Sequence, residues 1–236
     1  MTHGLSADHR MFCHQVEYYS KDYTVITWDV PMHGESRPYT DFSYPRATEE
    51  LKTILDGEGI EKIILMGHSM GGYVCQEFAI QHPKYIEAFI AIGTTPFGHC
   101  YYSKSDRWWL KNTESIMHMY PHKLLVKSIS KASTRTKEAY QNMLEMVSPY
   151  EKNELCRLIG IAYSDVFCRS EPNRFDFPVL LVVGKYDKTG KVKQYCRAWA
   201  EQEGYPLVWI DAAAHCCHVD NPQAFHQAVD AFLEKV

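Results

Sequence analysis

The sequence contains no uninterrupted apolar run long enough to cross a membrane, although 45% of its 236 residues are hydrophobic. A membrane-spanning helix needs about 20 consecutive apolar residues. The first ten residues, MTHGLSADHR, also lack the charged and then apolar order of a secretory signal. We therefore expect a cytoplasmic protein without a membrane span.

Two further patterns are missing. The 25 Lys and Arg residues against 29 Asp and Glu give a net charge of −4, and no basic cluster is long enough to follow a phosphate backbone, so nucleic acid is not an expected partner. The eight cysteines have no disulfide-framework spacing. In a reducing compartment they stay as thiols, and we interpret most of them as small core residues.

Apolar strand patterns and helical patterns alternate along much of the chain. This order predicts an α/β fold with a mainly parallel sheet, right-handed crossovers and helices on both faces. We expect Ser6 to cap the first helix, Gly57 to end the second, and Asn221 with Pro222 to begin the last. The expected strands are 23–30, 62–66, 88–93, 178–184 and 207–210, and the expected helices are 6–19, 47–56, 70–81, 190–203 and 222–236.

Residues 98–175 interrupt the alternation, because they contain no convincing strand and read as consecutive helices. We expect residues 1–97 and 176–236 to form the core and 98–175 to form an inserted helical cap. The many Met, Trp and Tyr residues of this insertion are typical of a surface that roofs an apolar pocket. The expected cap helices lie within 103–120, 121–130, 136–148 and 152–167.

Directly after the strand at 62–66 comes the sequence Gly-His-Ser-Met-Gly-Gly, residues 67–72. A serine on a sharp strand-to-helix turn needs residues without side chains two positions before and two after it, which Gly67 and Gly71 provide. Ser69 would then stand at a helix N-terminus, with the N–H of Met70 directed at a developing oxyanion. A glycine-rich turn with an incidental serine is the alternative interpretation.

A serine nucleophile needs a base and an acid that orients the base. Asp187 follows the expected strand 178–184, and His215 follows the strand 207–210, so both lie just past strand ends. The order Ser, Asp, His is that of α/β-hydrolases. His218 is an alternative base, and Asp211 and Asp220 are alternative acids.

The run His215-Cys216-Cys217-His218 could also suggest a metal site. Zinc ligands usually have two or more residues between them, and adjacent cysteines suit tetrahedral geometry poorly. We expect neither a metal nor an organic cofactor.

Together these residues make the chain resemble the α/β-hydrolase superfamily, particularly its small lid-bearing esterase and lipase-like members with a Gly-His-Ser-Met-Gly-Gly turn. The resemblance covers nearly the whole chain. His3-Gly4 resembles the family's His-Gly pair, which implies that Leu5 N–H is the second oxyanion donor beside Met70. Residues 29–36, DVPMHGES, resemble the family's Asp-x-x-Gly-x-Gly-x-Ser turn, with Met32 in place of the first glycine.

The chain departs from the family at its beginning. The family builds two or three strands before its His-Gly pair, and here only Met1 and Thr2 precede it. In the family, the strand leading into that pair lies between those corresponding here to 23–30 and 62–66. We expect either that the sequence begins downstream of the true start, or that 23–30 pairs directly with 62–66.

The resemblance implies a serine hydrolase that cleaves a small or medium apolar carboxylic ester through an acyl-enzyme. Amide, lactone or carbon–carbon bond hydrolysis on the same triad, a receptor-like protein that binds a ligand, and an inactive homologue are the alternatives. We expect a monomer or homodimer acting on a small-molecule carbonyl substrate. The candidate pocket residues are His68, Trp108, Trp109 and Met117, with Met119 and Tyr120 of the cap as further candidates; each could equally be a packing residue.

Overall fold

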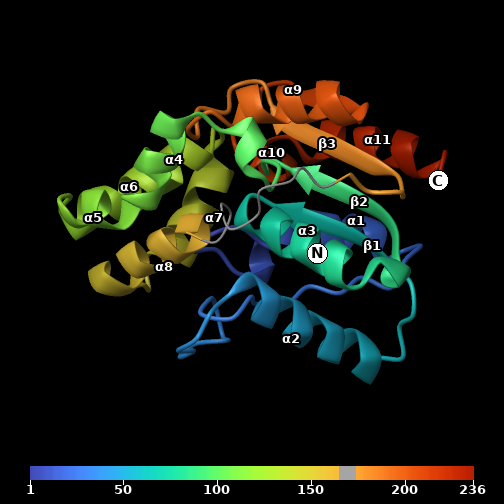
Figure 1. Cartoon of the computed structure of the whole chain (residues 1–236), viewed down its shortest axis with the longest axis horizontal. Coiled ribbons are helices and arrows are strands. Elements are labelled where there is room, and N and C mark those ends of the chain that lie inside the picture. The colour runs from blue at the N-terminus through green and yellow to red at the C-terminus, as the bar shows by residue number, and fades with distance from the viewer. Residues whose placement is uncertain (165–173) are drawn as a thin grey trace.

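The computed structural model describes residues 1–164 and 174–236. Its described part contains one sheet of four parallel strands in the order β1-β2-β3-β4 (Figure 1). The expectation of a parallel α/β sheet is therefore confirmed. The strands are β1 (Ile63–His68), β2 (Ile86–Ile92), β3 (Val179–Gly184) and β4 (Leu207–Ile210).

Helices cover both faces of this sheet because successive side chains of its strands point to opposite sides. In β2, Phe89 and Ala91 belong to one apolar cluster, whereas Ile90 and Ile92 belong to the other. The first cluster packs against α2 (Tyr44–Gly57), α3 (Met70–Gln81) and α9 (Val192–Glu203), and the second against α1 (Cys13–Tyr19) and α11 (Pro222–Leu233).

The expected strand at 23–30 is wrong. Only Trp28 of this segment makes an isolated bridge, and its partner is Thr2, which also bridges to Gly67 of β1. Thr2 therefore lies between the two segments, so 23–30 does not pair directly with β1. Before Trp28, residues 23–26 and residues 63–66 of β1 line the same cavity of about 540 Å³, and a strand cannot form where no ladder partner is within reach.

Two expected helix ends are also wrong. Ser6 has a positive φ of 57°, and the first turn, a 3-10 helix η1 (His9–Phe12), is capped instead by the side chain of Asp8. Gly57 lies inside α2, and the left-handed residue that follows the helix is Gly59, with φ 67°. The caps at the last helix are confirmed, since Asn221 accepts the N–H of Ala224.

Helices α4 to α8 form a lobe at the end of the sheet where the strands finish (Figure 1). The expected helix 103–120 is divided at Asn112, and residues 165–167 of the last expected cap helix lie outside the described residues. Apolar residues of α6 to α8 join the sheet's second cluster, and the boundary of a separate cap stays a prediction. The lobe comprises α4 (Lys104–Lys111), α5 (Thr113–His118), α6 (His122–Ser133), α7 (Lys137–Val147) and α8 (Lys152–Ser164).

Most cysteines are core residues, as expected. Five of the seven described cysteines are buried and two, Cys13 and Cys100, are exposed; all seven are free thiols. Cys168 lies outside the described residues. Among the described helices, none is both long and apolar enough to cross a membrane.

Candidate active site

Ser69 occupies the turn between β1 and α3 with φ 51° and ψ −117°, a backbone conformation that L-residues rarely adopt. The neighbouring glycines allow the turn to close. A Cβ atom on Gly67 would lie 2.7 Å from the Cys75 sulfur, and one on Gly71 would lie 2.2 Å from the carbonyl oxygen of Thr2. The glycines on either side of Ser69 thus allow a strained serine at the point where β1 meets the N-terminus of α3.

Two backbone N–H groups, one directly after Ser69 and one in the segment beside β1, make no hydrogen bond among the described residues. Within residues 1–164 and 174–236, neither the N–H of Met70 nor that of Leu5 makes a backbone hydrogen bond. The segment that carries Leu5 is held beside β1, because Thr2 N–H donates to Met66 O at 2.8 Å and His68 N–H donates to Thr2 O at 3.0 Å. Unpaired N–H groups of this kind are what an oxyanion hole requires.

His215 and Asp187 come together at the ends of β3 and β4. The Nδ1 atom of His215 lies 2.7 Å from Oδ2 of Asp187, and both side chains are buried. Oδ1 of Asp187 accepts the N–H of Thr189 at 2.7 Å. Burial alone would raise the pKa of Asp187, but the charge and hydrogen bond of His215 and the hydrogen bonds of Thr189 outweigh it and lower that pKa.

The end of β2 lies between Ser69 and the imidazole of His215. Ser69 N–H donates to Ile92 O at 2.8 Å, and the next residue, Gly93, has φ 53° and would place a Cβ 3.1 Å from Nδ1 of His215. In the described part of the chain the Ser69 hydroxyl itself makes no hydrogen bond. Catalytic hydrogen bonds often tighten only when substrate is bound.

The alternative base and acids occupy other environments. His218 is fully buried, and neither of its ring nitrogens has a partner among the described residues. Asp211 is 73% exposed and pairs with Lys185. Among the residues that the structure describes, Asp220 accepts only backbone N–H groups. The His–carboxylate pair at the strand ends is therefore His215 with Asp187.

Comparison with known proteins identifies the fold. Residues 1–112 match the family model described as the alpha/beta hydrolase fold. A thermophilic esterase from Thermogutta terrifontis superposes with a TM-score of 0.80 and 20% identity, covering 99% of this chain and 88% of that one. MenH from S. aureus gives a TM-score of 0.79 and 22% identity over 99% and 92%. The protein has the α/β-hydrolase fold.

Its sequence relatives carry more than one activity. An sn-1-specific diacylglycerol lipase from Mus musculus is 25% identical over 224 residues, which is 89% of this chain and 71% of the lipase. A 2-succinyl-6-hydroxy-2,4-cyclohexadiene-1-carboxylate synthase from Pectobacterium atrosepticum is 22% identical over 227 residues, 90% of this chain and 85% of the synthase. The proteins similar in sequence to this chain thus include a lipase and a synthase.

Asp220 has a structural role that the sequence did not reveal. Its Oδ2 accepts the N–H of Ala214 at 2.8 Å, and its Oδ1 accepts those of Arg135 and Thr136 at 2.8 Å. In parallel, Cys216 N–H donates to Ser133 O at 2.8 Å. The turn that carries the imidazole of His215 is thereby joined to the segment between α6 and α7. The sequence shows an acid just before the Asn-Pro start of the last helix, but it does not show which groups this acid contacts. Two of its three partners, Arg135 and Thr136, lie about 85 residues away in sequence.

His68, the residue before the serine, is buried between other histidines. Its ring lies 4.7 Å from that of His215 and 4.9 Å from that of His218, and its Nε2 donates to His215 O at 3.2 Å. Burial, with the two neighbouring rings, lowers the pKa of His68 well below its usual value. The ring is therefore neutral at pH 7, and it fills the space beside Gly4, where a Cβ would lie 2.6 Å from Nδ1.

The other pocket candidates differ in exposure. Trp108 and Trp109 at the end of α4 are each 58% exposed, whereas Met117 in α5 is partly buried and packs against the second cluster. A pocket role for these residues stays a prediction.

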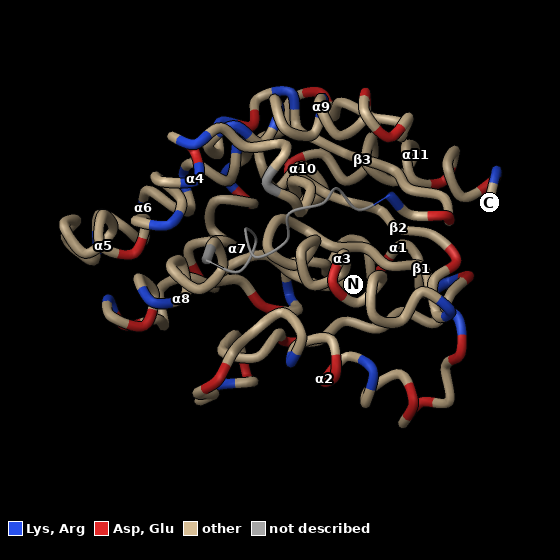
Figure 2. Tube along the Cα trace, in the orientation of Figure 1, with Lys and Arg blue, Asp and Glu red and all other residues tan. Residues whose placement is uncertain are grey.

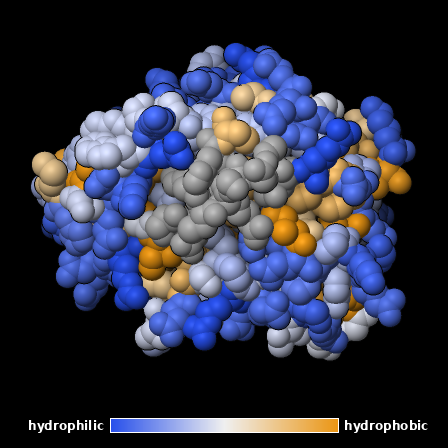
Figure 3. Space-filling view, viewed as in Figure 1, coloured by the Kyte–Doolittle hydropathy of each residue, from blue (hydrophilic) through white to orange (hydrophobic). Residues whose placement is uncertain are grey.

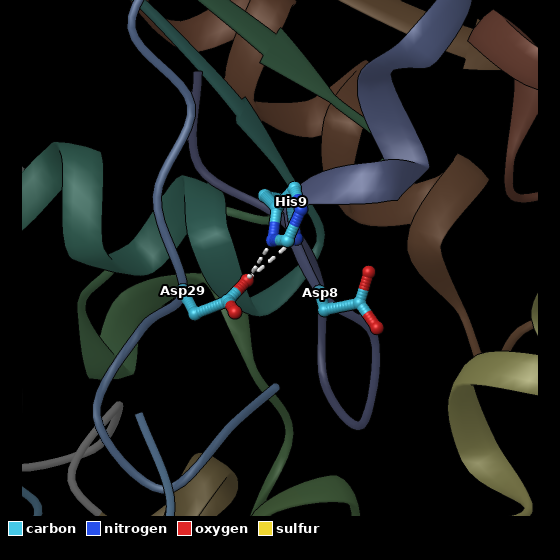
Figure 4. A group of neighbouring side chains, drawn as sticks. All are labelled: Asp8, His9 and Asp29. Atoms are coloured by element: carbon cyan, nitrogen blue, oxygen red, sulfur yellow. Dashed lines mark hydrogen bonds and ion pairs between the residues drawn. The ribbon is translucent and has the colours of Figure 1, made fainter. Parts of the chain in front are cut away.

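One group of side chains could be taken for a cation site. The ligand atoms of Asp8, His9 and Asp29 lie within 4.8 Å of one another (Figure 4). However, Asp29 already accepts the backbone N–H and Nδ1 of His9 and the N–H of Glu35, and Asp8 accepts three N–H groups of Arg10. We interpret this group as a hydrogen-bonded support that joins the turn after Asp29 to η1.

Proposed function

We propose that this protein is a serine hydrolase that cleaves small or medium apolar carboxylic esters through an acyl-enzyme, with Ser69, His215 and Asp187 as its triad. Two observations together carry the proposal. One is the strained serine at the β1–α3 turn, and the other is the buried His215–Asp187 hydrogen bond of 2.7 Å at the ends of β3 and β4. Strain at a nucleophile is retained when it positions the reacting group.

In the proposed reaction, Nε2 of His215 takes the proton of Ser69 as its oxygen attacks the ester carbonyl. The N–H groups of Met70 and Leu5 hold the oxyanion of the tetrahedral intermediate. Collapse of that intermediate releases the alcohol, which receives the proton from His215, and leaves the acyl group on Ser69. Water activated by His215 then releases the acid, while Asp187 keeps the imidazole in the required tautomer.

An apolar ester is the favoured substrate class for two reasons. Relatives and structural neighbours include proteins named as lipase and esterase. In addition, the residues around the triad, such as Met70 and Ala214, are buried and largely uncharged. A small apolar carbonyl compound fits such surroundings better than a charged one. The reaction needs no group beyond the side chains and backbone N–H groups named.

The test is hydrolysis of p-nitrophenyl esters from acetate to decanoate by the purified protein. We expect turnover at least about a thousandfold above the Ser69→Ala variant, and both proteins should melt at similar temperatures because the side chains differ by one oxygen. Turnover that survives in Ser69→Ala would remove this serine from the reaction.

A second candidate function is carbon–carbon bond chemistry, which the relationship to a synthase favours. Fluorophosphonate labelling separates the possibilities. Labelling of Ser69 without ester turnover would point to another carbonyl substrate or to a receptor-like protein, and no labelling would point to an inactive homologue.

A further inference from the structure

The lobe formed by α4, α5 and α6 exposes an unusual number of large apolar side chains. Trp108 and Trp109 are each 58% exposed, Met119 is 82%, Tyr120 is 45% and Leu124 is 50% exposed. These five are more than half of the nine large hydrophobic residues that the described part of the chain exposes. Exposed apolar groups concentrated in one region mark an interaction surface.

The apolar side chains lie at the two ends of the short helix α5. Trp108 and Trp109 precede it, with ring centres 5.2 Å apart, and Met119, Tyr120 and Leu124 follow it. A helix of six residues is about 9 Å long. Figure 3 shows hydrophobic residues at the tip of the lobe. The groups are therefore close enough to meet one flat surface together.

The same segment carries a charge opposite to that of the molecule. Residues 103–131 contain six Lys and Arg and two Asp and Glu, a net charge of +4 in a chain whose total is −4. Figure 2 shows basic residues along α4 and α6. Five lysines of this segment are exposed: Lys104, Lys111, Lys123, Lys127 and Lys131.

The two acids of the segment do not cancel this charge at the surface. Asp106 pairs with Lys191 at 2.6 Å and its side chain is 15% exposed. Glu114 lies against α8, where a Cβ on Gly160 would be 2.3 Å from its Oε2. The exposed charge of the lobe is therefore basic.

We propose that this surface, called here the α4–α6 face, docks the protein on a membrane that contains anionic lipids. Trp and Tyr prefer the boundary between headgroups and acyl chains, where an apolar ring and a polar N–H or O–H are both satisfied. Lysines around them attract anionic headgroups. A second copy of the chain would bring its own exposed lysines against these, and like charges facing each other disfavour association.

Docking through this face would place the lobe, and the end of the sheet that it covers, against the lipid. The inference is independent of the proposed hydrolysis, because docking depends on none of the triad residues. Binding is therefore measured with the Ser69→Ala variant, so that turnover of lipid cannot affect the result.

The experiment is cosedimentation of the protein with vesicles of phosphatidylcholine alone and of phosphatidylcholine with 30% phosphatidylserine. We expect binding to the anionic vesicles with a blue shift of tryptophan emission, and at least about tenfold weaker binding to neutral vesicles. Binding should also weaken as salt rises, since salt screens exposed charges.

Paired variants locate the surface. Lys123→Glu with Lys127→Glu, and separately Trp108→Ser with Trp109→Ser, should each weaken binding about tenfold or more. The control for the lysine pair is Lys84→Glu with Lys235→Glu, which makes the same change of charge at exposed residues outside the α4–α6 face. The control for the tryptophan pair is Tyr23→Ser, which removes an exposed aromatic ring outside that face. Both control proteins should bind the vesicles as the parent protein does. All these side chains are exposed, so circular dichroism should show unchanged folding.

Three results would overturn the proposal. One is the absence of vesicle binding at low salt. Another is equal binding by the face variants and their controls. The third is a concentration-dependent dimer that Trp108→Ser with Trp109→Ser dissociates, which would assign the face to a second copy of the chain.

Discussion

Both oxygens of the Asp187 carboxylate are occupied, one by His215 Nδ1 at 2.7 Å and the other by the N–H of Thr189 at 2.7 Å. In the proposed reaction this carboxylate accepts a hydrogen bond from Nδ1–H and so leaves Nε2 unprotonated, ready to accept the proton of Ser69. In this proposal Asp187 acts on the serine only through the imidazole, so replacing it should change the rate of the chemical step.

Replacing Asp187 by Asn tests this effect. An amide can present its NH₂ group to Nδ1 and select the wrong imidazole tautomer, so we expect kcat for ester hydrolysis to fall by about 10³ to 10⁴ with little change in KM. Steady-state kinetics on a p-nitrophenyl ester measure both values. The matched control is Asp211→Asn, a carboxylate also near a strand end but 73% exposed. Equal rates for the two variants would contradict the role of Asp187.

At the scale of elements, the carboxylate of Asp220 joins the turn after β4 to the start of α7, beside the backbone hydrogen bond from Cys216 to Ser133. Asp220 is 8% exposed and accepts three backbone N–H groups. Because a neutral amide has only one acceptor oxygen, Asp220→Asn leaves a buried N–H without a partner, at a cost of about 2 kcal/mol.

We therefore expect Asp220→Asn to lower the free energy of unfolding in urea by about 2 kcal/mol. It should also lower kcat more than it raises KM, since the turn that holds His215 loosens. Asp211→Asn, which breaks a surface pair with Lys185, should cost under about 0.5 kcal/mol. Equal losses of unfolding free energy in the two variants would contradict the stabilising role of the Asp220 hydrogen bonds.

Several elements could be predicted from sequence because local pattern and burial agree. The helix at 70–81 and the strand at 207–210 have the predicted bounds. The segment 23–30 has the composition of a buried strand but lacks a ladder partner, and pairing is a tertiary property that composition does not contain. The helix expected at 103–120 divides because Asn112 ends α4 before α5 begins.

The same limit applies to the candidate site. The sequence predicts that Ser69, Asp187 and His215 each follow the end of a strand. In the structure Asp187 is hydrogen-bonded to His215. The partners of Asp220 could not be predicted, because two of them are backbone N–H groups in the distant segment between α6 and α7. Nor could sequence show that Trp108 and Trp109 are exposed, since apolar residues at helical spacing normally indicate a buried face.

For the molecule as a whole, buried histidines set the response to acid. Burial is the largest cause that lowers the pKa of each of four histidines, and it brings those of two to about 3. Such a ring stays neutral in the folded state, while the unfolded chain protonates it below about pH 6.5. The four residues are His3, His33, His68 and His218.

The sign of the effect follows from these pKa values. Above pH 6.5 these histidines are neutral in both the folded and the unfolded state, so they do not change the free energy of unfolding with pH. Below pH 6.5 the unfolded state binds more protons than the folded state. Each histidine then lowers the free energy of unfolding by about 1.4 kcal/mol per pH unit. We expect urea midpoints to be similar at pH 7.5 and 6.8 and to fall steeply between pH 6 and 5. His218→Phe, which keeps the packing on Phe12 and Phe225, should reduce that slope by one proton. A midpoint that is constant from pH 7.5 to 5 would contradict this account.

The central claim is that His215 activates the hydroxyl of Ser69, and covalent labelling tests it most directly. The protein is treated with a fluorophosphonate, digested, and mapped by mass spectrometry, beside the His215→Gln variant. We predict one adduct on the peptide that contains Ser69 and, in the variant, labelling slower by about 10³-fold or more. No adduct on that peptide, or equal labelling rates in the two proteins, would contradict the claim.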